Sequence, residues 1–138
     1  MSRKKQESLW LDRSLFVSPY YYRLCLTEKE FQKELKSLKV PRNQWPEFNN
    51  GRKSGGTVHT FEYEENLCAI VSIKALKHHT LWQIHAMIVH EAQHLMDYIF
   101  RDMGEVNPSY KLKAYGIQHI CQQLMMSYEQ QTKKRGKK

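Results

Sequence analysis

The residues best suited to chemistry are two histidines in the stretch VHEAQHL, which spans positions 89–95. His90 and His94 are four residues apart, so on a helix that advances about 100° per residue their side chains lie one above the other. Two imidazole nitrogens placed in this way can bind one Zn²⁺ at about 2.0–2.1 Å. The spacing therefore predicts a zinc site on a helix.

Glu91 completes an HExxH motif with these histidines. It is turned about 100° from His90, too far to share the coordination comfortably, but it is well placed to hold a water on the metal. Zinc lowers the pKa of such a water to about 7, so Glu91 can take its proton as it attacks a carbonyl. The motif therefore predicts zinc-dependent hydrolysis, with Glu91 as the catalytic base.

A long helix is expected to carry the motif. Thr80 and Gln83 form a capping box at its start, and Met103-Gly104 terminates it after about Arg101. The expected core stripe consists of Ile84, Ile88, Ala92, Leu95 and Ile99. The histidines lie off that stripe, so a solvated face is one interpretation. Because the helix is apolar over most of its circumference, we favour a buried helix whose narrow polar stripe faces a cleft.

Two further helices are expected. Thr27 begins a capping box, which predicts a helix over about 27–39 that ends at Pro41. Asn107-Pro108 combines a good N-cap with proline at the first helical position, and predicts a last helix that runs to about Gln130.

Two strands are expected between the first helix and the metal helix. The segment 41–56 is rich in Pro, Asn and Gly and is predicted to be a loop. Alternating side chains at 57–63 and 67–73 predict two adjacent strands, and 64–66 suits a hairpin turn. The element order indicates an α+β fold, in which a short antiparallel sheet packs on the metal helix and on the last helix.

A catalytic zinc site normally has three protein ligands, so a third was sought in the last helix. One stripe of that helix carries Lys111, Tyr115, Gln118, His119 and Gln122. The opposite side, with Ile117, Cys121, Leu124 and Tyr128, is the better core face. If the first stripe faces the metal helix, His119 is the best third ligand, Glu105 is the alternative, and Tyr115 could donate a hydrogen bond to an oxyanion on the substrate. The structural alternatives are an exposed histidine, a charge favourable to the helix N-terminus, and interface packing, respectively.

The stretches GGTVHTFEYEENLCAIVSI and IVHEAQHLMDYIFRDMGEVNPSYKLKAYGIQHI resemble a family of small, uncharacterised HExxH proteins encoded by tailed bacteriophages and prophages. The resemblance covers about residues 20–130, and its most specific part is the HExxH helix followed by GExxPS and AYxIQ. It implies a zincin-like domain in which His90 and His94 bind Zn²⁺ and Glu91 is the base. The family pattern usually has a glutamate four residues before the tyrosine of AYxIQ. This chain has Lys111 there, a poor zinc ligand at neutral pH.

The net charge of +8 belongs to the two ends of the chain. Eight of the 22 basic residues are Arg3, Lys4, Lys5, Lys133, Lys134, Arg135, Lys137 and Lys138, which leaves 14 basic against 14 acidic residues elsewhere. We therefore expect an N-terminal arm at 1–19, a zincin-like domain at 20–130 and a basic disordered tail at 131–138. Such tails can bind nucleic acid without sequence specificity, although solvated ends are the plainer explanation.

Cys25, Cys68 and Cys121 lack CxxC spacing, which favours reduced thiols in the cytosol over a disulfide framework. No apolar run of about 18 residues exists, and none follows the basic N-terminus, so neither a membrane span nor a secretory signal is expected. The expected location is the cytoplasm, which is that of the host cell if a phage encodes the protein.

Three functions are compatible with these observations. The first is a minimal zinc metallopeptidase, in which the edge of the hairpin receives an extended peptide. The second is a degenerate zincin scaffold that acts through protein contacts, which Lys111 favours. The third is a nucleic-acid-associated phage protein that works through its basic tails. The remaining histidines, His59, His78, His79 and His85, are expected to be solvated or packed.

Overall fold

The computed structural model describes residues 10–11, 19–49 and 55–136. Its elements are β1 (Tyr20–Cys25), α1 (Glu28–Ser37), a short 3₁₀ helix (Arg42–Gln44), β2 (Gly56–Tyr63), β3 (Asn66–Ile73), α2 (Leu81–Met103) and α3 (Tyr110–Gly136). The strands form one sheet in the order β1-β3-β2, with β1 parallel and β2 antiparallel to β3. The α+β class predicted from the sequence is confirmed.

The predicted hairpin of β2 and β3 is confirmed, and β1, which runs parallel to β3, corrects the predicted antiparallel sheet to a mixed three-stranded one. Tyr20, Tyr22 and Leu24 are buried on one face of this strand, and Arg23 and Cys25 are buried on the other. The sequence YYYRLC shows no alternation of apolar and polar residues, and no strand was predicted there.

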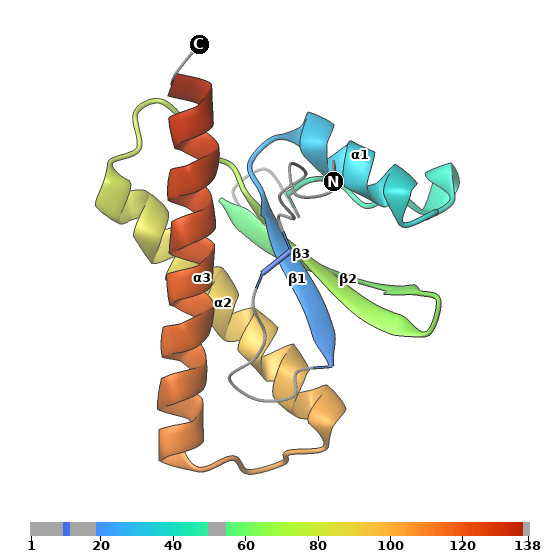
Figure 1. The fold of residues 1–138 in the computed structure, drawn as a ribbon, viewed down its shortest axis with the longest axis vertical. Coiled ribbons are helices and arrows are strands. Elements are labelled where there is room, and N and C mark those ends of the chain that lie inside the picture. Colours follow the sequence, from blue (N-terminus) through green and yellow to red (C-terminus); the bar gives the residue numbers. More distant parts are fainter. Residues whose placement is uncertain (1–9, 12–18, 50–54, 137–138) are drawn as a thin grey trace, which may run out of the picture.

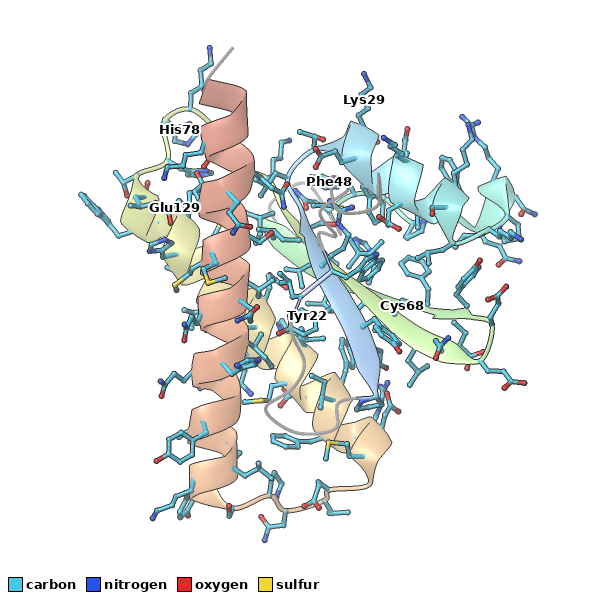
Figure 2. The ribbon with its side chains drawn as sticks, viewed as in Figure 1. Tyr22, Lys29, Phe48, Cys68, His78 and Glu129 are labelled. Atoms are coloured by element: carbon cyan, nitrogen blue, oxygen red, sulfur yellow. The ribbon has the colours of Figure 1, made fainter. Side chains whose placement is uncertain are left out.

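The sheet lies between two layers (Figure 1). The helices α2 and α3 cover one face, where their apolar side chains pack with Tyr22, Val71 and Ile73. The helix α1 and the segment that follows it cover the other face, where Phe31 and Phe48 belong to a second apolar cluster. Figure 2 shows Tyr22 beside the sheet on the side of α2, and Phe48 under α1. The two faces of the sheet therefore pack against two distinct apolar clusters.

The ends of α2 agree closely with the sequence prediction. The Thr80 hydroxyl accepts a hydrogen bond from the Gln83 backbone N–H at 3.1 Å, and the Thr80 N–H donates to the Gln83 side chain at 2.8 Å. Gly104 ends the helix in the left-handed conformation, with φ of 78°. The five residues of the expected core stripe, Ile84, Ile88, Ala92, Leu95 and Ile99, are all buried. Local signals in the sequence therefore determine where α2 begins, where it ends and which of its faces is buried.

The helix α3 begins two residues later than predicted. In the first turn of the helix, the Ser109 hydroxyl, and not the Asn107 side chain, accepts a hydrogen bond from the Leu112 N–H at 3.1 Å. The predicted cap at Asn107 is therefore corrected to Ser109, and Asn107-Pro108 lies in the connection before the helix.

The helix α3 also extends beyond its predicted end at Gln130, to Gly136. Residues 131–136, which were expected in a disordered tail, are helical. The reason is tertiary: buried Gln131 donates hydrogen bonds from Nε2 to the Leu24 carbonyl and to the Ser127 hydroxyl, both at 3.0 Å. This contact ties the last turns of the helix to the end of β1.

The shorter connections also follow the prediction closely. Thr27 caps α1 by accepting the Glu30 N–H at 3.2 Å, and Glu64-Glu65 forms the tight turn between β2 and β3. The expected arm at 1–19 lies mostly outside the described residues, but Leu11 donates its backbone N–H to the Tyr22 carbonyl at 3.0 Å. None of the helices in the described part has both the length and the apolar character that a bilayer crossing requires.

Candidate metal centre

His90 and His94 lie on the flank of α2 that faces the beginning of β2. Their Nε2 atoms are 3.3 Å apart, and their ring planes meet at 73°. Two ligand atoms bound to one zinc at about 2.0–2.1 Å, in tetrahedral geometry, are about 3.3–3.4 Å from each other. The separation of the two nitrogens therefore fits one shared zinc ion. The same distance also allows an N–H···N hydrogen bond between two neutral imidazoles, which keeps the rings together without a cation.

The two rings open into a pocket and not onto a flat surface. This pocket has a volume of about 280 Å³. It is lined by Gly56, Thr57, Val58, His90, Glu91, His94 and Tyr98. His90 and His94, which are both exposed, thus border a cleft between α2 and β2, whereas Asp97 of the same polar stripe lies toward α3.

Glu91 lies at the floor of this pocket and is only 5% exposed. Burial raises the pKa of its carboxyl group, and the nearby His90 and His94 lower the pKa in the opposite sense. A carboxylate held between a helix and a strand has few rotamers, so its orientation toward the pocket is fixed by packing. In chemical terms it is a carboxyl group beside two imidazoles whose spacing could hold a metal ion.

Gly56 is the residue that allows Glu91 and β2 to come so close. A Cβ atom at this position would lie 2.9 Å from the Glu91 Cγ, the Ile73 Cδ1 and the Ser72 carbonyl oxygen. All three distances are shorter than real Cβ contacts, and one of these atoms is backbone. We had expected this glycine to belong to a loop. Its signal in the sequence is a glycine pair at the start of a strand, where another chain segment approaches closely.

The helix α3 packs against another flank of α2, and this packing determines whether the predicted third ligands can reach the pocket. Gln93, Met96 and Phe100 of α2 face Lys113 and Ile117 of α3. At about 100° per residue, this flank is roughly a third of a turn around the helix from the one that carries His90 and His94. Residues of α3 therefore meet α2 on a different flank from the pocket.

Only part of the predicted stripe of α3 lies toward α2. Tyr115 is 59% exposed and Lys111 is exposed as well, whereas Gln118 and Gln122 line a groove together with His85 of α2. The opposite side carries the core contacts, as its apolar residues suggested: Leu124 is buried, and Ile117, Cys121 and Tyr128 pack against the same cluster. Neither Tyr115 nor Lys111 lines the pocket.

A third protein ligand does not emerge from the described residues. They contain no group of three His, Cys, Asp or Glu side chains that could hold a metal ion. The structure therefore does not bring His119 or Glu105 to the pair of His90 and His94, and the geometry supports neither as the third ligand.

Tyr98 lines the pocket and was missed by the sequence reasoning. It follows His94 by four residues, just as His94 follows His90, so the three side chains share one flank of α2. The Arg101 guanidinium carbon lies 4.9 Å from the centre of its ring. The four-residue spacing was visible in the sequence, but tyrosine was sought only on the last helix.

None of the other described histidines lines this pocket. His59 is buried on the face of the sheet that α1 covers, where its Nε2 lies 2.9 Å from the Phe48 carbonyl oxygen. Burial lowers the pKa of His59, so the neutral form is favoured there. His79 accepts a hydrogen bond from the Leu76 N–H at 3.0 Å. These two are packed, as we expected, and His85 lines a different, apolar groove between α2 and α3.

The strand β2 is at an edge of the described sheet, beside the pocket. Lys74 donates its N–H to the Gly55 carbonyl at 2.8 Å, which fixes the alternation of hydrogen bonds along β2. In an antiparallel pair, every second residue directs its backbone groups away from its partner. Val58 and Thr60 occupy these positions, so their backbone N–H and C=O groups point toward the open edge.

Comparisons with protein-family models, with curated proteins and with solved structures find no match for this chain. The resemblance to phage-encoded HExxH proteins and the zincin-like details of the fold therefore stay predictions. The function has to be argued from the geometry of the pocket.

Proposed function

We propose that this chain is a zinc-dependent metallopeptidase-like protein, in which His90 and His94 hold the metal and Glu91 is the catalytic base. The observation that carries the proposal is the 3.3 Å separation of the two Nε2 atoms, in a pocket that also contains buried Glu91. Zinc in this place would supply Lewis acidity, which polarises a carbonyl group and makes water more acidic. The resemblance to phage and prophage HExxH proteins supports the same assignment.

The proposed substrate is a peptide or protein segment in an extended conformation. Such a segment can add to an exposed sheet edge by backbone hydrogen bonds. Val58 and Thr60 offer those hydrogen-bonding groups at the edge of β2, next to the pocket. A peptide docked there would pass its backbone carbonyls in front of His90 and His94.

The proposed reaction is hydrolysis of one peptide bond. A water oxygen forms a bond to the carbonyl carbon, while the π electron pair of the carbonyl moves to its oxygen and one water proton passes to a Glu91 carboxylate oxygen. The C–N bond then breaks, and the proton held by Glu91 goes to the leaving nitrogen. Water is consumed, and a carboxylic acid and an amine are formed. Glu91 is suited to both transfers because it is fixed at the floor of the pocket.

The test of this function is the variant Glu91→Gln. The amide keeps the size of the side chain but cannot accept a proton, so hydrolysis of a quenched-fluorescent peptide mixture should fall by about 10²- to 10⁴-fold. The zinc content, measured by elemental analysis of protein purified without added metal, should stay that of the wild type. Hydrolysis that is insensitive to this substitution would show that Glu91 is not the base.

A catalytically degenerate zincin scaffold is the second candidate function. It is favoured by the lack of a third His, Cys, Asp or Glu ligand among the described residues, together with Lys111 where the resemblance implies a glutamate. This protein would act through contacts with a protein partner. Zinc bound by the wild type without any hydrolysis that Glu91→Gln removes would favour the scaffold over the peptidase. Nucleic-acid binding through the basic ends stays a prediction.

A further inference from the structure

Tyr98 is a pocket side chain to which the proposed reaction has so far given no role. It lies on the same flank of α2 as His90 and His94, at the same four-residue spacing. Side chains on a helix lean toward its N-terminus, so a residue one turn further along the helix projects back over the preceding turn. The phenol of Tyr98 therefore belongs to the wall of the pocket beside His94.

The ring of Tyr98 contacts the cationic side chain of Arg101, which in turn contacts Asp102 and Tyr20. The Arg101 guanidinium carbon lies 4.9 Å from the centre of the Tyr98 ring, within the range of a cation–π contact. Arg101 Nη2 is 3.2 Å from Asp102 Oδ2, and it donates a hydrogen bond to the Tyr20 hydroxyl oxygen at 3.3 Å. The Tyr20 hydroxyl in turn donates to Asp102. The ring of Tyr98 is thereby connected to the start of β1, and its orientation does not depend on α2 alone.

The roles proposed for the other side chains of the pocket leave the substrate carbonyl oxygen without a hydrogen-bond donor. His90 and His94 are assigned to the metal and Glu91 to the proton, while Val58 is apolar. Among the described residues that line the pocket, Thr57 and Tyr98 carry a hydroxyl group. Thr57 belongs to β2, opposite Ser72, whereas Tyr98 shares the flank of α2 that carries His90 and His94.

We propose that Tyr98 is a catalytic residue, which donates the hydrogen bond of its phenol to the substrate carbonyl oxygen as that oxygen becomes negatively charged. Arg101 is the positioning residue that keeps the Tyr98 ring in place. This inference rests on the proposed hydrolytic function. A donor aimed at a developing oxyanion stabilises the transition state more than the bound substrate, so it acts on kcat. The role that the sequence suggested for Tyr115 thus passes to a residue of the metal helix.

The variant Tyr98→Phe tests this role, because it removes only the hydroxyl group. With zinc-loaded protein and a quenched-fluorescent peptide mixture, kcat/KM should fall by about 10²- to 10³-fold. The affinity for a phosphinic peptide, whose tetrahedral anionic oxygens imitate the oxyanion, should fall by at least about tenfold. The affinity for zinc itself, measured by competition with a chromophoric chelator, should stay that of the wild type.

Tyr110→Phe is the matched control. Tyr110 is 88% exposed at the start of α3 and lies under a cation at the same three-residue spacing, since the Lys113 Nζ is 5.7 Å from its ring centre. This variant loses the same atom from a comparable pair and should keep wild-type kinetics.

The positioning role of Arg101 has its own readout. Arg101→Gln should lower kcat by about tenfold with little change in KM, because the hydroxyl is present but less well aimed. Arg101→Lys retains a cation beside the ring and should recover most of that loss. A substitution that merely weakened the fold would not be rescued in this way.

The outcomes separate the two levels of the proposal. Hydrolysis that is absent, or that Glu91→Gln does not reduce, overturns the proposed function and the role of Tyr98 with it. Hydrolysis that depends on Glu91 but is unchanged in Tyr98→Phe overturns the role of Tyr98 alone. A loss of zinc affinity in Tyr98→Phe also overturns the donor role, since Tyr98 would then be a metal ligand.

Discussion

At the scale of single residues, the histidines of this chain differ in the neighbours that packing gives them. The Nε2 atoms of His90 and His94 lie 3.3 Å apart beside β2, whereas His85 of the same helix faces an apolar groove toward α3. His59 is enclosed by aromatic rings and a backbone carbonyl, including Phe31 at 4.7 Å between ring centres. The chemistry of an imidazole is thus decided by which flank of an element it occupies.

Removing one imidazole of the pair tests the metal site directly. His94→Ala should lower zinc affinity by at least about 100-fold, because one of two convergent protein ligands is lost. Competition with a chromophoric chelator measures the change. His85→Ala removes an imidazole from the same helix, but outside the pocket, and should bind zinc as the wild type does. Equal affinity in all three proteins would exclude zinc binding by His94.

At the scale of elements, the site depends on how closely α2 approaches β2. Gly56 provides this approach, since any side chain would meet Glu91, Ile73 and the Ser72 carbonyl. The same strand presents an open edge beside the pocket, so one element supplies both the close contact and the proposed docking surface.

Gly56→Ala should therefore damage the site as well as the fold. Inserting a methyl group into a filled space costs about 1–3 kcal/mol in the free energy of unfolding, which chemical denaturation measures. The displaced strand should also weaken zinc binding and hydrolysis. Gly104→Ala is the control: it has open space but a φ of 78°, so it should cost about 1–2 kcal/mol by backbone strain alone and leave zinc affinity unchanged.

At the scale of the whole molecule, a polar cluster joins the first strand to the end of the metal helix. Tyr20 of β1 is buried and donates its hydroxyl to Asp102 of α2, which also contacts Arg101. Burial, together with Asp102, raises the pKa of Tyr20 from its ordinary value of 10.0 to about 12. The folded state therefore favours the protonated phenol.

This pKa shift predicts how stability changes at alkaline pH. Because the folded pKa of Tyr20 is above the unfolded one, its contribution is fully present below pH 10.0 and is lost as the pH rises toward about 12. Tyr20→Phe should be less stable than the wild type by about 1–2 kcal/mol at pH 8, through loss of the hydrogen bond to a carboxylate. The difference should narrow above pH 10. Urea denaturation of both proteins across this range measures it, and a difference independent of pH would contradict the assignment.

The amino-acid sequence by itself determined α2, the helix that carries the HExxH motif. Its capping box, its terminal glycine and its apolar stripe involve residues a few positions apart. Local hydrogen bonds and helical periodicity are therefore enough to place His90, Glu91 and His94 on adjacent turns of one helix. The same locality explains why β2 and β3 were predicted, since side chains alternate along 57–63 and 67–73. The strand β1 was not predicted, because its sequence YYYRLC does not alternate in this way.

Only the tertiary structure decided which side of α2 each neighbour occupies. A helix that is apolar over most of its circumference can accept partners on several flanks, and the choice among them depends on contacts between segments far apart in the chain. Packing placed α3 on a different flank of α2 from the histidines, so that His119 and Tyr115 do not line the pocket. It placed β2 beside the histidines, so that Gly56 of β2 lines the pocket together with Tyr98 of α2. The spacing of the two histidines was local, whereas the residues around them depended on the tertiary structure.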